Sequence, residues 1–164
     1  MLTINTSDIS PLELQGYLQS AIAPRPICFA STIDLEGNVN LSPFSFFNLF
    51  SMNPPICIFS PSRRVRDNTT KHTLENIKEV PECVINIVNY NMVQQVSLSS
   101  CDYPKGTSEF VKAGFTELAS ELVRPPRVAE SPIQLECIVQ EVIALGAQAG
   151  AGNLVLAEIK KIHL

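Results

Sequence analysis

The chain has 164 residues, of which 45% are hydrophobic and 17% are charged, and its formal net charge at pH 7 is −4. This length and composition predict one domain spanning residues 1–164, with a substantial apolar core. The net negative charge and a pI near 5.2 argue against a nucleic-acid or anionic-membrane surface. The apolar runs are too short for a membrane-spanning helix, and the N-terminus carries no signal-peptide pattern.

The positions of the cysteines and histidines indicate which disulfides and metal sites the chain can form. The five cysteines are scattered without any Cys-x-x-Cys spacing, and four of them lie in apolar, strand-like runs. This pattern predicts reduced core thiols in a cytoplasmic protein. His72 and His163 lie far apart in the sequence and have no partners at ligand spacing, so we expect no metal site.

The predicted elements begin with a helix over residues 11–21. Ser10 and Glu13 form a capping box around Pro11, a proline at the first helical position. The elements that follow are, in chain order, strand 27–33, hairpin turn 34–38, strand 39–41, an apolar segment 42–48, strand 56–59, helix 73–80, strand 83–88, helices 92–98 and 108–113, a weak strand 115–120, and long strands 133–145 and 154–164.

The balance of these elements predicts the fold class. Six or seven strands with few helices, and without regular alternation of strand and helix, indicate a mostly β protein with a closed antiparallel barrel. Glycine-rich dinucleotide and P-loop motifs are absent from the sequence. If a nucleotide-like phosphate binds, the barrel itself must hold it.

The most distinctive segment is the basic loop, which we define as residues 63–72. It carries four of the chain's 12 Lys and Arg residues, namely Arg63, Arg64, Arg66 and Lys71, directly before the helix predicted at 73–80. Cations beside the free N–H groups of a helix N-terminus favour phosphate binding. A solvated charged loop is the alternative interpretation of this segment taken alone.

Three segments stand out together by their order and spacing. They are residues 24–34 (PRPICFASTID), residues 40–48 (NLSPFSFFN) and residues 60–77, which contain SPSRR and KHTLENI. With support from residues 109–116 and 131–137, they resemble the flavin reductase-like proteins with an FMN-binding split barrel, the family that includes flavoredoxin. The resemblance covers roughly residues 20–164 and implies a closed antiparallel split β-barrel of Greek-key type with a few short helices. Such proteins usually continue past a strand matching 154–164, so this chain is either shortened there or a short member.

The resemblance implies FMN as the cofactor and assigns roles to eight residues. Ser31 and Thr32 would lie near the ribityl-phosphate arm, and Arg64, Lys71 and Thr73 would hold the phosphate. Ser45, Phe46 and Asn48 would line the isoalloxazine ring, largely through their backbone groups. Simpler interpretations stand beside these roles. Phe46 can be a core residue, Ser31 can cap a hairpin, Arg63 and Arg66 can be solvated, and His72 can be a neutral loop residue.

The same resemblance implies the activity. NAD(P)H would pass a hydride to the flavin, and two subunits would form a homodimer with FMN near the interface. The cofactor carries this chemistry, so no side chain is assigned as a catalytic acid or base. Two alternatives are a flavoredoxin-like electron carrier and a flavin-binding module without turnover. No segment discriminates NADH from NADPH.

Overall fold

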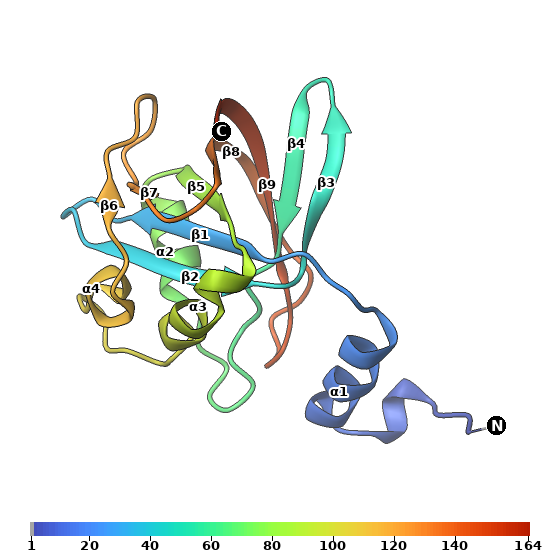
Figure 1. Cartoon of the computed structure of the whole chain (residues 1–164). Helices are drawn as coiled ribbons and strands as arrows, with labels where there is room; N and C mark the ends of the chain where they lie inside the picture. Colours follow the sequence, from blue (N-terminus) through green and yellow to red (C-terminus); the bar gives the residue numbers. More distant parts are fainter. Residues whose placement is uncertain (1) are drawn as a thin grey trace.

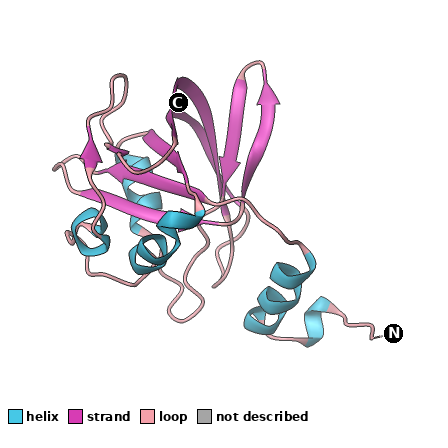
Figure 2. Ribbon diagram, in the orientation of Figure 1, coloured by secondary structure: helices cyan, strands magenta, loops and turns pink. Residues whose placement is uncertain are grey.

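The computed structural model describes residues 2–164, which form a curved antiparallel sheet with short helices at one side and a separate N-terminal helix (Figure 1). The strands of the main sheet are β1 Cys28–Ile33, β2 Val39–Phe44, β3 Phe47–Met52, β4 Pro55–Phe59, β5 Glu82–Ile87, β8 Ile133–Ala144 and β9 Asn153–His163. Their order in the sheet is β2-β1-β5-β8-β9-β4-β3. A small second sheet pairs β6 Glu117–Leu118 with β7 Arg127–Val128 (Figure 2).

The helices match the sequence expectations to within one residue. They are α1 Pro11–Ala21, α2 His72–Glu79, α3 Val93–Ser99 and α4 Glu109–Ala113, with short 3-10 turns at η1 Thr6–Asp8 and η2 Tyr90–Met92. The predicted capping box is confirmed, because the Ser10 side chain accepts from the Glu13 N–H while the Glu13 carboxylate accepts from the Ser10 N–H at 3.0 Å. Gly114 ends α4 with a φ of 71°, in the left-handed region that glycine adopts readily.

The two long strands β8 and β9 join the two halves of the sheet. β5 pairs with β8 over Ile133–Ile138, and β4 pairs with β9 over Val155–Glu158. The register of the β8–β9 pair shifts twice, between Glu136 and Cys137 and between Val139 and Glu141. Shifts of this kind bend and twist a strand pair, and they lie where the sheet turns from one half into the other.

The sheet is split and not closed. β2 and β3 are its two edges, and in the described residues they pair only with β1 and β4. The chain passes directly from β2 into β3 through Ser45 and Phe46, so the two edges meet at this corner and diverge beyond it (Figure 1). The predicted mostly β, antiparallel fold with a few short helices is confirmed, but no pairing between β2 and β3 closes the sheet into a barrel within residues 2–164.

Strand β3 is also missing from the elements predicted from the sequence. In the pairing of β3 with β4, Leu49 lies opposite Cys57 and Ser51 lies opposite Ile56. Phe50 therefore has no partner and forms a bulge. Leu49 and Phe50 are both exposed. An edge strand with a bulge lacks the regular alternation of apolar and polar residues by which a strand is recognised.

The buried side chains form two clusters, one on each face of β1. Cys28 and Ala30 face a cluster inside the curved sheet, whereas Phe29 packs against Phe115 and the helices α3 and α4. The expected burial of four cysteines is confirmed, since Cys28, Cys57, Cys83 and Cys137 all lie in the first cluster as free thiols. The fifth, Cys101, is exposed.

Candidate functional site

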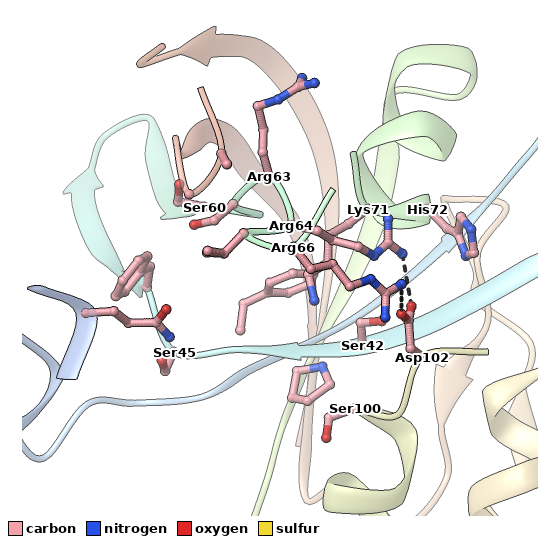
Figure 3. A pocket seen from close by; sticks show the side chains of 18 of the residues that line it. Ser42, Ser45, Ser60, Arg63, Arg64, Arg66, Lys71, His72, Ser100 and Asp102 are labelled. Atoms are coloured by element: carbon pink, nitrogen blue, oxygen red, sulfur yellow. Dashed lines mark ion pairs between the residues drawn. The ribbon is translucent and has the colours of Figure 1, made fainter. Parts of the chain in front are cut away.

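A cavity of about 780 Å³ opens at the corner where β2 passes into β3. Its walls come from helix α1, residues 42–46, residues 60–66 with 71–72, residues 100–103 after α3, and the loop between β8 and β9 at Ala149 and Gly150. In Figure 3 the side chains of Arg64, Arg66 and Lys71 gather on one side of the cavity, and Ser45 lies on the other side, towards α1. The cavity therefore has one cationic side and one largely apolar side.

The basic loop is an ordered turn held by its own side chains. The Arg64 N–H donates to the carbonyl of Thr69 at 2.9 Å, and the Asn68 N–H donates to the carbonyl of Arg64 at 2.9 Å. Arg63 Nε donates to Asn68 Oδ1 at 2.6 Å, and its guanidinium points away from the other cations (Figure 3). Arg63 thus stabilises the loop, while Arg64 and Lys71 face the cavity.

Arg64 and Lys71 bring two positive charges together beside the N-terminus of α2. Lys71 is the N-cap residue of α2 and is half-buried, and no ion pair reaches it within residues 2–164. Burial, and then the nearby Arg64 guanidinium, lower the pKa of Lys71. Adjacent cations at a helix N-terminus form a local positive potential that an anion relieves.

One carboxylate, that of Asp102, enters this cationic side. Its Oδ1 lies 3.4 Å from Arg64 Nη2, and its Oδ2 pairs with Arg66 Nη2 (Figure 3). Arg66 also pairs with Asp67 at 3.0 Å, as its position in the sequence suggests, and its side chain is 66% exposed. Arg66 is therefore mostly neutralised by carboxylates, whereas Lys71 is not.

Ser60 supplies a polar atom that no protein group satisfies. Its Oγ is buried, lines the cavity, and has no hydrogen-bond partner among the described residues. A buried hydroxyl without a partner costs free energy, and a polar ligand atom would remove that cost. A Cβ at Gly152 would come within 2.6 Å of this Oγ, so glycine keeps the space around the hydroxyl open.

Beneath the cationic side lies a buried polar network. The Asn40 side-chain amide lies between Thr73 and Glu109. In the orientation that satisfies both, its oxygen accepts from Thr73 Oγ1 at 2.8 Å and its nitrogen donates to Glu109 Oε1 at 3.3 Å. Glu109 also accepts from the Leu41 N–H at 3.1 Å, and burial raises the pKa of its carboxyl. The network ties β2 to the first turn of α2 and to α4, which fixes the position of Lys71.

The apolar side is built by the β2–β3 corner and by helix α1. Phe44 and Phe46 contribute from the corner, and Leu14 and Leu18 contribute from α1. Phe44 also packs against Phe59 in the core with ring centroids 5.5 Å apart, whereas Phe46 is exposed. A flat aromatic ligand fits a wall of this kind.

The structure brings together half of the residues expected at the site. Ser45, Phe46, Arg64 and Lys71 line the cavity. Thr73 lies behind the wall, where its hydroxyl bonds Asn40.

The other three differ from the placement expected for direct ligands. Ser31 and Thr32 are fully buried, and their hydroxyls bond Pro126 O and the Asn76 amide. Ser31 lies in the middle of the sheet, where β1 pairs with both β2 and β5, and Thr32 follows it in the β1–β2 pair. Asn48 is exposed on β3, and its side chain accepts from the following N–H at 2.8 Å.

Several wall residues were not anticipated from the sequence. Ser60 lies inside the resembling SPSRR segment, so that motif could have indicated it. Glu109 likewise begins the resembling segment 109–116. Asp102 and the face of α1 carry no such signal, because only the folded chain brings them to the cavity. Within residues 2–164 no group of three or more His, Cys, Asp or Glu side chains is arranged to hold a metal ion. In the same residues, none of the helices has the length and apolar character that crossing a membrane requires.

The split antiparallel sheet thus carries a cavity that is cationic on one side and aromatic on the other, an arrangement that suits a flat ligand with an anionic arm. The chain belongs to the flavin reductase like domain family, whose model matches residues 20–164.

Relatives and solved structures agree with this membership. A protein of Halalkalibacterium halodurans, BH2278, is 40% identical over 149 residues, which cover 91% of this chain and 71% of the relative. An Aquifex aeolicus protein is 38% identical over 116 residues, or 71% of this chain and 59% of the relative. The crystal structure of nitrilotriacetate monooxygenase component B from Bacillus cereus superposes with a TM-score of 0.93 at 30% identity, covering 100% of this chain and 81% of that one.

Proposed function

We propose that this protein is an FMN-dependent oxidoreductase that passes a hydride from NADH or NADPH to flavin. The observation that carries the proposal is one cavity that joins paired cations, Arg64 and Lys71, to an aromatic and aliphatic wall. Family membership and the similarity to nitrilotriacetate monooxygenase component B support a flavin oxidoreductase. A cytoplasmic location, suggested by the scattered cysteines, stays a prediction.

The residues of the cavity fit FMN. Arg64 and Lys71 would bind the phosphate, the unpartnered Ser60 hydroxyl would bond a polar atom of the cofactor, and Ser45 and Phe46 would lie against the ring. Thr73 would act indirectly by holding Asn40 beneath Lys71. FMN held by these residues would supply the two-electron chemistry of hydride transfer. The protein would orient the cofactor, with Leu14 and Leu18 of α1 lying along one side of it.

Turnover separates this proposal from its two alternatives. Purified protein with FMN is mixed with NADH or NADPH, and the loss of nicotinamide absorbance is followed against a control without protein. We expect catalysed oxidation of at least one nicotinamide. Flavin binding without any oxidation would instead indicate an electron carrier or a binding module, and absence of flavin binding would contradict all three.

The basic residues are expected to differ in their effect on FMN affinity. Lys71→Ala and Arg64→Ala should each weaken binding by about 1–3 kcal/mol, since each removes a charge-assisted hydrogen bond. Arg66→Ala should change it by less than about 0.5 kcal/mol, because its charge is exposed and already paired. Fluorescence titration of the apo-protein with FMN measures all three. Equal losses in Arg66→Ala and Lys71→Ala would mean that the loop acts only as a diffuse positive field.

The exposed edge of the sheet is expected to pair two subunits. Phe46, Leu49, Phe50 and Met52 at the β2–β3 corner and along β3 are 46–78% exposed, and apolar surface of this kind favours a two-fold dimer. Light scattering at micromolar concentration should give the mass of a dimer. Phe50→Asp should shift it towards the monomer, and Val111→Asp, at an exposed apolar site on α4, should not. A monomer that still binds FMN would contradict the expectation.

A further inference from the structure

The position of Asp102 has a consequence for every anion that binds Arg64. Both hydrogens of Arg64 Nη1 can be used within the basic loop, by Thr69 Oγ1 at 3.1 Å and by the carbonyl of Thr70. An anion in the cavity therefore reaches Arg64 through Nη2 and Nε. The Asp102 carboxylate lies on Nη2 at 3.4 Å, so the anion must share that edge of the guanidinium with a negative charge.

Asp102 also reduces the net charge of the cationic side. It pairs with Arg66 as well as Arg64 and lines the cavity with both (Figure 3). Its side chain is 42% exposed and that of Arg64 is 17% exposed, so water screens the carboxylate only in part. A charge in this position repels a phosphate at Lys71 and Arg64.

Asp67 provides an internal comparison. It too pairs with Arg66, at 3.0 Å. However, Asp67 is not in the wall of the cavity, and its carboxylate is committed to the turn, where it accepts from the Thr69 N–H at 3.0 Å and the Thr69 hydroxyl at 2.6 Å. The two carboxylates share one arginine, but only Asp102 faces the proposed phosphate position.

We propose that Asp102 is a specificity-determining residue that limits how tightly the cavity holds a phosphate-bearing flavin, so that the flavin exchanges with solution. This inference rests on the proposed binding of FMN by Arg64 and Lys71. Asp102 offsets part of the attraction that these cations exert on the phosphate. It leaves the contacts of the ring unchanged, because it lies on the cationic side and the ring lies along the corner of β2 and β3.

The test compares FMN and riboflavin, which differ only in the phosphate, on three forms of the full-length protein. Asp102→Asn removes the charge and keeps the shape, and Asp67→Asn is the matched control. At low ionic strength Asp102→Asn should bind FMN about tenfold more tightly and release it more slowly. Riboflavin affinity should stay unchanged, and Asp67→Asn should leave the affinity for FMN within about twofold. The gain in Asp102→Asn should shrink in 1 M salt.

Each outcome decides between explanations. Weaker FMN binding in Asp102→Asn would overturn the inference, because the carboxylate would then help binding by orienting Arg64. Unchanged FMN binding would overturn it too, because the carboxylate would then have no effect on the phosphate. A parallel gain for riboflavin would overturn it as well, since the effect would not depend on charge. If the unaltered protein binds FMN and riboflavin equally, the phosphate site itself fails and takes this inference with it.

Discussion

FMN is expected to bind this protein at least about 100-fold more tightly than riboflavin. The phosphate of FMN is a dianion, and the cavity offers it the Lys71 ammonium, the Arg64 guanidinium and the free N–H groups at the start of α2. Charge-assisted hydrogen bonds contribute about 1.5–3 kcal/mol each. Two of them correspond to a factor of 100 or more in the dissociation constant.

Quenching of flavin fluorescence on titration with apo-protein measures this difference for the two flavins. The preference should decrease with salt, because part of it is electrostatic. In Lys71→Ala the ratio of FMN affinity to riboflavin affinity should fall by a larger factor than the riboflavin affinity does. Equal affinity of the unaltered protein for both flavins would show that the basic loop does not bind the phosphate.

The sequence predicted the local elements well because their signals are local. The capping box at Ser10 and Glu13 appears where its residues indicate, and α2 begins at His72, one residue before its predicted start. The same holds for the basic loop, since its four cations and the following helix are neighbours in the chain. Arg64 and Lys71, on the cationic side of the cavity, could be predicted in this way.

What the sequence missed depends on contacts between distant segments. Asp102 and Glu109 reach the cavity only because α3 and α4 pack against β1 and β2. Leu14 of α1 reaches the cavity only because residues 22–27, between α1 and β1, place the helix beside it. The closed barrel was predicted because strand count and alternation do not reveal whether two edge strands pair. Ser31 and Thr32 are buried in the sheet with their hydroxyls bonded inside the protein, so their predicted role beside the cofactor stays a prediction.

The protein is expected to lose stability when Glu136 loses its charge. Glu136 on β8 is fully buried, and its carboxylate accepts from the N–H groups of Glu121 at 2.9 Å, Leu122 at 2.6 Å and Val123 at 3.2 Å. His163 Nε2 lies 2.6 Å from its Oε1. Burial by itself raises the pKa of Glu136, but these hydrogen bonds outweigh burial and leave the pKa below its ordinary value of 4.5.

A carboxyl whose pKa is lower in the folded than in the unfolded state stabilises the fold at pH values above the unfolded pKa. That contribution is lost as the pH falls below about 4.5 towards the folded pKa. Glu136→Gln keeps the shape but places an amide among donors, and should lower the free energy of unfolding at pH 7 by about 3 kcal/mol. Glu141→Gln, at an exposed position of the same strand, should change it by less than about 0.5 kcal/mol.

Urea denaturation followed by circular dichroism, at pH 7 and then in steps from pH 5 down to about pH 2, measures both effects. The unaltered protein should lose stability over this range more steeply than Glu136→Gln, and the two should converge because protonation removes the same charge that the substitution removes. Lys161, which pairs with Glu121, and His163 are the nearby groups whose own charges enter the comparison, so His163→Gln is measured alongside. Parallel pH curves for the unaltered protein and Glu136→Gln would show that Glu136 does not carry the acid sensitivity, and that the turn at 121–123 is held by its packing alone.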